Sequence, residues 1–176
     1  MLFTARSLVT MAHGLVFGGG ALLALAALLF SLAFLAHPER PEAAAVQART
    51  ISRLAVVAAV FIWVAIIGGT YLVFPPYRAT PPEGLTDLAA YPRSFLLASP
   101  GTAWLHAFAM ETKEHVPWMA GMLATAVAFV GVRYRSAFLT DRGLRGRATA
   151  LATLCFLLVA WTSLLGVLVN KVAPLE

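Results

Sequence analysis

The sequence predicts an all-α integral membrane protein: four transmembrane helices in an up-down-up-down bundle, with a short interfacial helix in the outer loop. Hydrophobic residues make up 60% of the 176 residues and charged residues 12%, whereas soluble domains average about 45–50% and about 25%. A chain with so few charges cannot cover its surface with polar groups in water, so the lipid bilayer is its expected solvent. Residues 1–176 are expected to form a single membrane domain.

Four apolar runs approach or reach the roughly 20 residues that a transmembrane helix needs. They cover residues 8–36, 54–74, 116–132 and 148–170. The first run is too long for the core of a cleaved signal peptide, which is about 7–15 residues, and is expected to be a retained helix. The outer loop is residues 75–115. Within it, Thr102 suits the N-cap of an interfacial helix over residues 102–114.

The basic residues are distributed unevenly between the two sides. Eight arginines lie in the links after the first and third spans: Arg40, Arg49, Arg53, Arg133, Arg135, Arg142, Arg145 and Arg147. The other side holds Arg6, Arg78, Arg93, Lys113 and Lys171. The positive-inside rule therefore predicts a multi-pass protein of the inner (cytoplasmic) membrane with both termini outside. Because the arginines cluster at span ends, the formal net charge of +5 does not indicate nucleic-acid binding.

Histidines near the spans raise the first hypothesis about function, because ionisable residues at membrane depth are costly. His13 lies near the outer end of the first span, His115 begins the third, and His106 lies in the predicted interfacial helix. His37 alone is on the cytoplasmic side, as an interfacial residue. The first and third helices run in the same direction and lie diagonally across such a bundle. His13 and His115 are therefore predicted to reach the two faces of one heme iron.

Residues around this pair extend the hypothesis. Small residues beginning with Gly20 share the face of His13. Close helix packing is the favoured explanation for them, and space for a flat macrocycle is the functional alternative. Glu111 is placed to orient the His115 ring. Lys171 either binds a heme propionate or extends to the interface. Counted from the cytoplasmic ends, the two histidines differ in depth by roughly 9 Å at 1.5 Å per residue, much of which helix tilt can absorb. His106 is the alternative iron ligand if only one of the two histidines binds the heme.

The general plan resembles the small four-helix anchor subunits of respiratory complexes, of the cytochrome b type, which bind heme through histidines on two spans. The resemblance consists of the four-span layout and the placement of His13 and His115. It implies one heme b, partner subunits in a larger membrane complex, and electron exchange with a quinone or a periplasmic electron carrier. On this interpretation the chain is no enzyme alone but an electron-transfer subunit of an oxidoreductase complex.

Two other interpretations remain open. The first is a cofactor-free anchoring or accessory subunit, which the small-residue helix faces and the apolar membrane interior favour. The second is a metal or quinone site at the outer leaflet, built from His106, Glu111, Glu114 and His115. A transporter is disfavoured because no span carries a charge near its middle. The single cysteine, Cys155, excludes an intrachain disulfide and any paired-cysteine metal motif.

Overall fold

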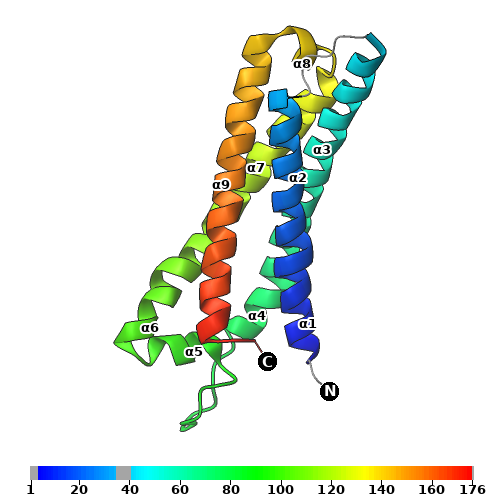
Figure 1. Cartoon of the computed structure of the whole chain (residues 1–176). Helices are drawn as coiled ribbons and strands as arrows, with labels where there is room; N and C mark the ends of the chain where they lie inside the picture. The colour runs from blue at the N-terminus through cyan, green and yellow to red at the C-terminus, as the bar shows by residue number, and fades with distance from the viewer. Residues whose placement is uncertain (1–3, 35–40, 176) are drawn as a thin grey trace.

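The computed structural model describes residues 4–34 and 41–175, and these residues form helices and loops without a strand (Figure 1). The first span consists of α1 (Ala5–Met11), the π-helical η1 (Ala12–Gly18) and α2 (Gly19–Phe34). The second consists of α3 (Pro41–Gly68), the π-helical η2 (Gly69–Val73) and α4 (Phe74–Tyr77). The third consists of α6 (Pro100–Trp104), the π-helical η3 (Leu105–Met110) and α7 (Glu111–Arg133). The fourth is α9 (Arg142–Val172), and the links contain α5 (Pro92–Leu97) and α8 (Ala137–Thr140).

Four helical segments in the described residues are long and apolar enough to cross a membrane, as the sequence predicted. They are 30, 36, 34 and 31 residues long, which exceeds the predicted apolar runs. The extra length arises because Glu, Gln, Lys and Arg are good helix formers, so a helix continues past the point where its hydropathy falls. The predicted end of the first span at Ala36, together with His37 and Arg40, lies outside the described residues.

The predicted interfacial helix is not separate from the third span. Helical residues run without interruption from Pro100 to Arg133, and Pro117 lies inside α7 rather than at its start. Proline has no backbone N–H, so the carbonyl of Lys113, four residues earlier, lacks its usual helical partner. Whether residues 102–114 lie along a membrane surface stays a prediction.

The four long segments lie side by side, and both ends of the described chain are at the same end of the molecule (Figure 1). We call this the terminal end, and we call the opposite end, which holds α8 and its flanking arginines, the arginine end. In the described residues α3 packs against α2 and α7, and α9 packs against α2 and α7. Each of these helices therefore touches two others around a shared core.

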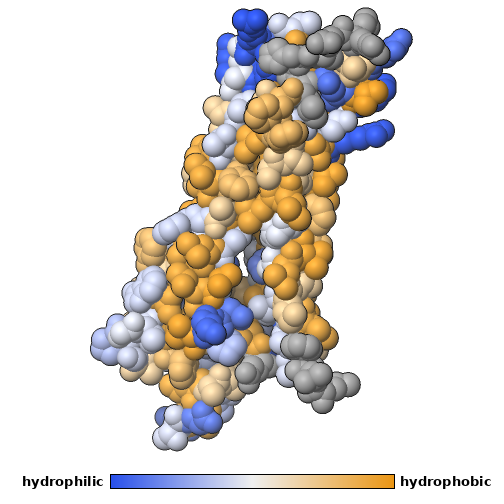
Figure 2. All heavy atoms as spheres, in the orientation of Figure 1, coloured by the Kyte–Doolittle hydropathy of each residue, from blue (hydrophilic) through white to orange (hydrophobic). Residues whose placement is uncertain are grey.

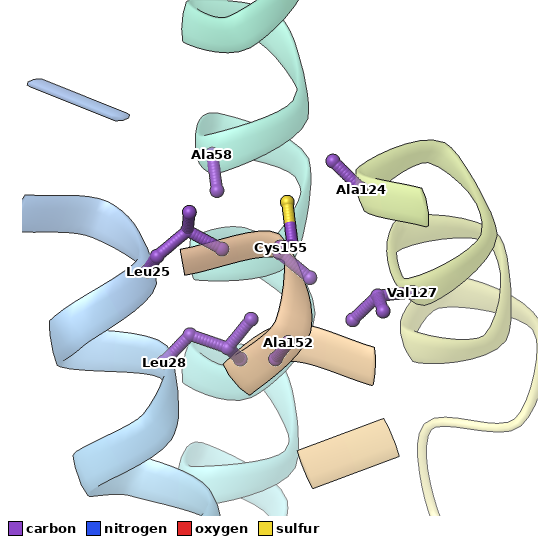
Figure 3. A pocket seen from close by; sticks show the side chains of 8 residues that line it. Leu25, Leu28, Ala58, Ala124, Val127, Ala152 and Cys155 are labelled. Carbon is purple, nitrogen blue, oxygen red and sulfur yellow. The ribbon is translucent and has the colours of Figure 1, made fainter. Parts of the chain in front are cut away.

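The core of the arginine half is tightly packed. Side chains from all four spans point toward one another there (Figure 3), and they leave no space for a water molecule. The lining residues are Leu25, Leu28, Ala55, Ala58, Ala124, Val127, Ala152 and Cys155. Small alanines on three of the helices let the backbones approach closely, which is how helices associate in lipid. The described side chains that line this part of the core are therefore packed without a water-sized space between them.

A second apolar cluster lies at the terminal end, where η3, α9 and the outer loop meet. Its buried members are Tyr77, Leu96, Leu105, Ala109, Met110, Leu165, Val169, Ala173 and Leu175. Along α7 the two clusters leave residues 111–119 between them, and along α9 they leave residues 160–164. The polar side chains of Lys113 and Thr162 fall in this interval. Polar side chains from two spans therefore lie between the two apolar clusters.

Candidate functional site

His13 is the first polar residue of this intermediate level. It lies in η1, and its ring packs on the backbone of Gly69 at the start of η2, where an added Cβ would come within 2.8 Å of the ring Cε1. Its Nδ1 atom is buried and has no hydrogen-bond partner among the described residues. Both elements in this contact are π-helical, a conformation that is rare and that often occurs at functional sites. The backbone of Ala65 in the second span also engages the ring, so the first and second spans hold an imidazole with one buried nitrogen, Nδ1, that is not used.

Lys113 of α7 is the second residue of the site. Its Nζ atom lies over Gly166 of α9, only 2.6 Å from the position that a Cβ would occupy there. The ammonium donates one long hydrogen bond, of 3.4 Å, to the carbonyl of Thr162. No carboxylate among the described residues compensates its charge, and this charge acts electrostatically on His13. The bundle therefore contains an amine and an imidazole near each other without an anionic partner.

An opening between the first and fourth spans lies at the same level. The two spans approach at Gly18, where an added Cβ would be 3.7 Å from the Ser163 hydroxyl. Toward the terminal end from this contact, α1 packs mainly against η2 rather than α9. Figure 2 shows a hollow between the two columns of helix in this half, with apolar side chains on both sides. The hollow faces the direction in which lipid would lie.

His106 occupies a different polar cluster, nearer the terminal end. It is 9% exposed, and its Nε2 atom accepts a 3.3 Å hydrogen bond from Nε of Arg93. Because a guanidinium can only donate, the ring proton is on Nδ1, which donates to the Tyr77 hydroxyl at 3.0 Å. Glu111 and Glu114 are close enough to act electrostatically on both rings. His106 therefore joins the second span, the outer loop and the third span, and both of its nitrogens are engaged by protein.

His115, the predicted partner of His13, is exposed. Its Nδ1 donates to the carbonyl of Glu111 in the preceding turn at 2.8 Å, which leaves Nε2 unbonded. Residues two apart on an α-helix point in nearly opposite directions. Because Lys113 points toward α9 inside the bundle, His115 points away from it. The structure of the single chain thus does not bring the two imidazoles together, and the shared heme b stays a prediction.

The remaining predicted site residues are placed as follows. The space beside Gly20 is occupied by the Phe61 ring of α3, which would lie 2.9 Å from an added Cβ. The small size of Gly20 therefore serves helix packing. Lys171 and Glu111 are exposed, and Glu114 is half-buried. In residues 4–34 and 41–175, no three His, Cys, Asp or Glu side chains converge as metal ligands. The metal-site alternative therefore lacks a ligand set within the described chain.

Sequence reasoning counted Lys113 only as one of the outer charges and did not place it in a site. The available signal was the pairing of Lys113 with His115 two residues apart, since one of the two must face the bundle if the other faces lipid. Gly69 and Gly166 make room for the His13 ring and the Lys113 ammonium. Nothing in the sequence separates these two glycines from the other glycines of the spans.

A comparison with family models, curated proteins and solved structures found no match.

Proposed function

We propose that this chain is a membrane subunit of an electron-transfer complex and that its redox ligand lies between the spans in the terminal half, beside His13 and Lys113. The observation that carries the proposal is the Lys113 ammonium, which has no anionic partner among the described residues and acts electrostatically on an imidazole with an unbonded nitrogen. A charge inside a membrane span is costly and marks a functional site by default. A subunit that only anchored others would gain stability from an apolar residue at this position.

The location of the site favours electron transfer over transport. The eight described residues that line the core of the arginine half leave no water-sized space between them, which disfavours passage of a polar solute at this point. The hollow between the two columns of side chains opens sideways (Figure 2), and we place the entry to the site there. A site that is reached from lipid and closed toward one face suits a lipid-soluble or membrane-held redox group. The proposal includes the up-down-up-down order of spans and places both termini outside.

One purification tests this function. The tagged chain is isolated from its own membranes in mild detergent, and the co-purifying subunits are identified by mass spectrometry. We expect at least one partner that carries a redox centre, and we expect electron transfer by that complex to fall when Lys113→Met replaces the wild-type chain. Recovery of the chain without redox partners, or full electron transfer with Lys113→Met, would contradict the proposal and favour the cofactor-free anchor.

The reduced-minus-oxidised absorption spectrum of the same sample tests the heme b prediction. A low-spin heme spectrum that is lost in His13→Ala and in His115→Ala would support axial ligation by these two residues. Because the two side chains point in different directions in the single chain, such a result would also require His115 to meet the heme through a rearrangement of α7 or through a neighbouring chain.

A further inference from the structure

We infer that the redox ligand beside His13 and Lys113 is a quinone. Its head group accepts a hydrogen bond from Lys113, its reduced (quinol) form donates one to Nδ1 of His13, and its tail leaves between the first and fourth spans. This inference rests on the proposed function, since it names the ligand of the same site. It differs from the outer-leaflet site predicted from sequence, which used His106, Glu111, Glu114 and His115.

The hydrogen-bonding groups match a ligand that carries acceptors. An ammonium can only donate, and Lys113 has a single long contact to a carbonyl. A neutral imidazole donates through one nitrogen and accepts through the other. The backbone carbonyl of Ala65 engages the His13 ring and can only accept, so the unpartnered Nδ1 is left as an acceptor. A quinone head group is a flat ring with oxygens on opposite edges, which are carbonyls in the oxidised form and hydroxyls in the reduced form. Lys113 can therefore donate to one edge, and His13 can accept from the other edge once the ring is reduced.

The surroundings favour a lipid-soluble ligand over a water-soluble anion. The Lys113 ammonium lies at Gly166, six residues before the end of α9, which is about 9 Å inside the helix end at 1.5 Å per residue. The second apolar cluster lies between this level and the terminal end. A phosphate or carboxylate head group at the membrane surface would have to leave water to reach that depth. A quinone dissolves in the bilayer as a whole molecule and enters sideways.

Two glycines provide small probes of the site. A methyl group added at Gly69 meets the His13 ring at 2.8 Å, and one added at Gly166 meets the Lys113 Nζ at 2.6 Å. Each clash involves the end of a side chain, so Gly69→Ala and Gly166→Ala would displace the imidazole and the ammonium while leaving both chemically intact. Gly68→Ala is the matched control, because an added Cβ there has no neighbour within 4 Å.

The test is photolabelling of the intact complex in its native membranes with an azido-quinone that carries a decyl tail. Mass spectrometry then locates the labelled peptides. We expect labels on η1, α7 or α9 near the site, and we expect excess decylubiquinone to compete whereas decanol, which has only the tail, does not. Labelling should fall at least tenfold in Lys113→Met, His13→Leu, Gly69→Ala and Gly166→Ala. It should be unchanged in the matched control Gly68→Ala.

Thermal unfolding of each variant separates loss of the site from loss of the fold. Lys113→Met should be at least as stable as the wild type, because it removes an uncompensated charge from the bundle. Equal labelling of the wild type and Lys113→Met would overturn the quinone assignment. Competition by decanol would overturn it as well, and so would a heme spectrum that is lost in His13→Leu, because the His13 nitrogen would then bind iron.

If the complex transfers electrons but its chain is not labelled, the ligand assignment fails while the function stands. If labelling is specific but no redox partner exists, the function fails while the quinone site stands.

Discussion

Removing the His106 side chain should destabilise the terminal end of the protein by an amount that the structure allows to be worked out. In His106→Leu the Tyr77 hydroxyl, on a residue that is 2% exposed, loses its hydrogen-bond partner. A buried polar group without a partner costs about 1–3 kcal/mol. The hydrogen bond from Arg93 is also lost, which adds about 1 kcal/mol. We therefore expect a total loss of about 2–4 kcal/mol in the free energy of unfolding.

A second substitution shows whether the hydrogen bond is the cause. Tyr77→Phe removes only the hydroxyl and leaves Nδ1–H of His106 buried without an acceptor, at a cost of about 1–2 kcal/mol. In the double variant both partners are apolar, so neither is left unsatisfied. The double variant should therefore be more stable than the sum of the single effects predicts, with a coupling of about 1 kcal/mol or more.

The measurement is unfolding of the purified chain in mixed micelles with increasing dodecyl sulfate, followed by far-ultraviolet circular dichroism. Arg93→Gln serves as a third variant that tests the guanidinium alone and should cost less than His106→Leu. Additive effects of His106→Leu and Tyr77→Phe would refute the reasoning, because they would mean that the two side chains are not joined. A loss below about 0.5 kcal/mol for His106→Leu would refute it as well.

Three further predictions concern the architecture. Single cysteines at Thr86 and Ser136 should show opposite accessibility to an impermeant thiol reagent added from outside, with only the first labelled; the reverse pattern would invert the proposed orientation. The segment 75–115 should resist protease in native membranes, because η3 and part of the outer loop are packed in the second apolar cluster, and cleavage throughout it would contradict that packing. Gly121→Ala should destabilise the bundle by about 1–3 kcal/mol, since its Cβ would meet an α3 methyl at 2.9 Å, whereas Gly19→Ala, which has open space, should not.

Hydropathy predicted the four spans because the cost of exposing polar backbone and side chains to lipid leaves few alternatives to a long apolar helix. It did not predict their ends, since helix propensity and membrane depth are set by different forces. Glu42 and Arg142 stand in the first turns of long helices in the structure, although both are charged and lie outside the predicted runs. A charged residue ends an apolar run but does not end a helix.

The candidate site was predicted in part. The sequence predicted His13 near the outer end of the first span. That prediction needs only the position of His13 within an apolar run. Its partner could not be found in the same way, because the direction of a side chain depends on the rotation of its helix about its own axis. Lys113 and His115 are two residues apart, and rotation of α7 decides which of them faces the bundle. The three π-helical stretches make that rotation harder to predict, since each adds residues to a turn.

The same π-helical stretches would allow the helices of the terminal half to shift in register by single residues. Each is a local excess of residues within an otherwise α-helical span, and shifting it by one residue turns the neighbouring side chains by about 100° about the helix axis. His13 and His106 both lie within such stretches, and Gly69 begins the third. A one-residue register shift would thus exchange the inward and outward positions of polar groups without breaking any span. If the proposed site binds a ligand through His13, such a shift would couple binding to rotation of the first span.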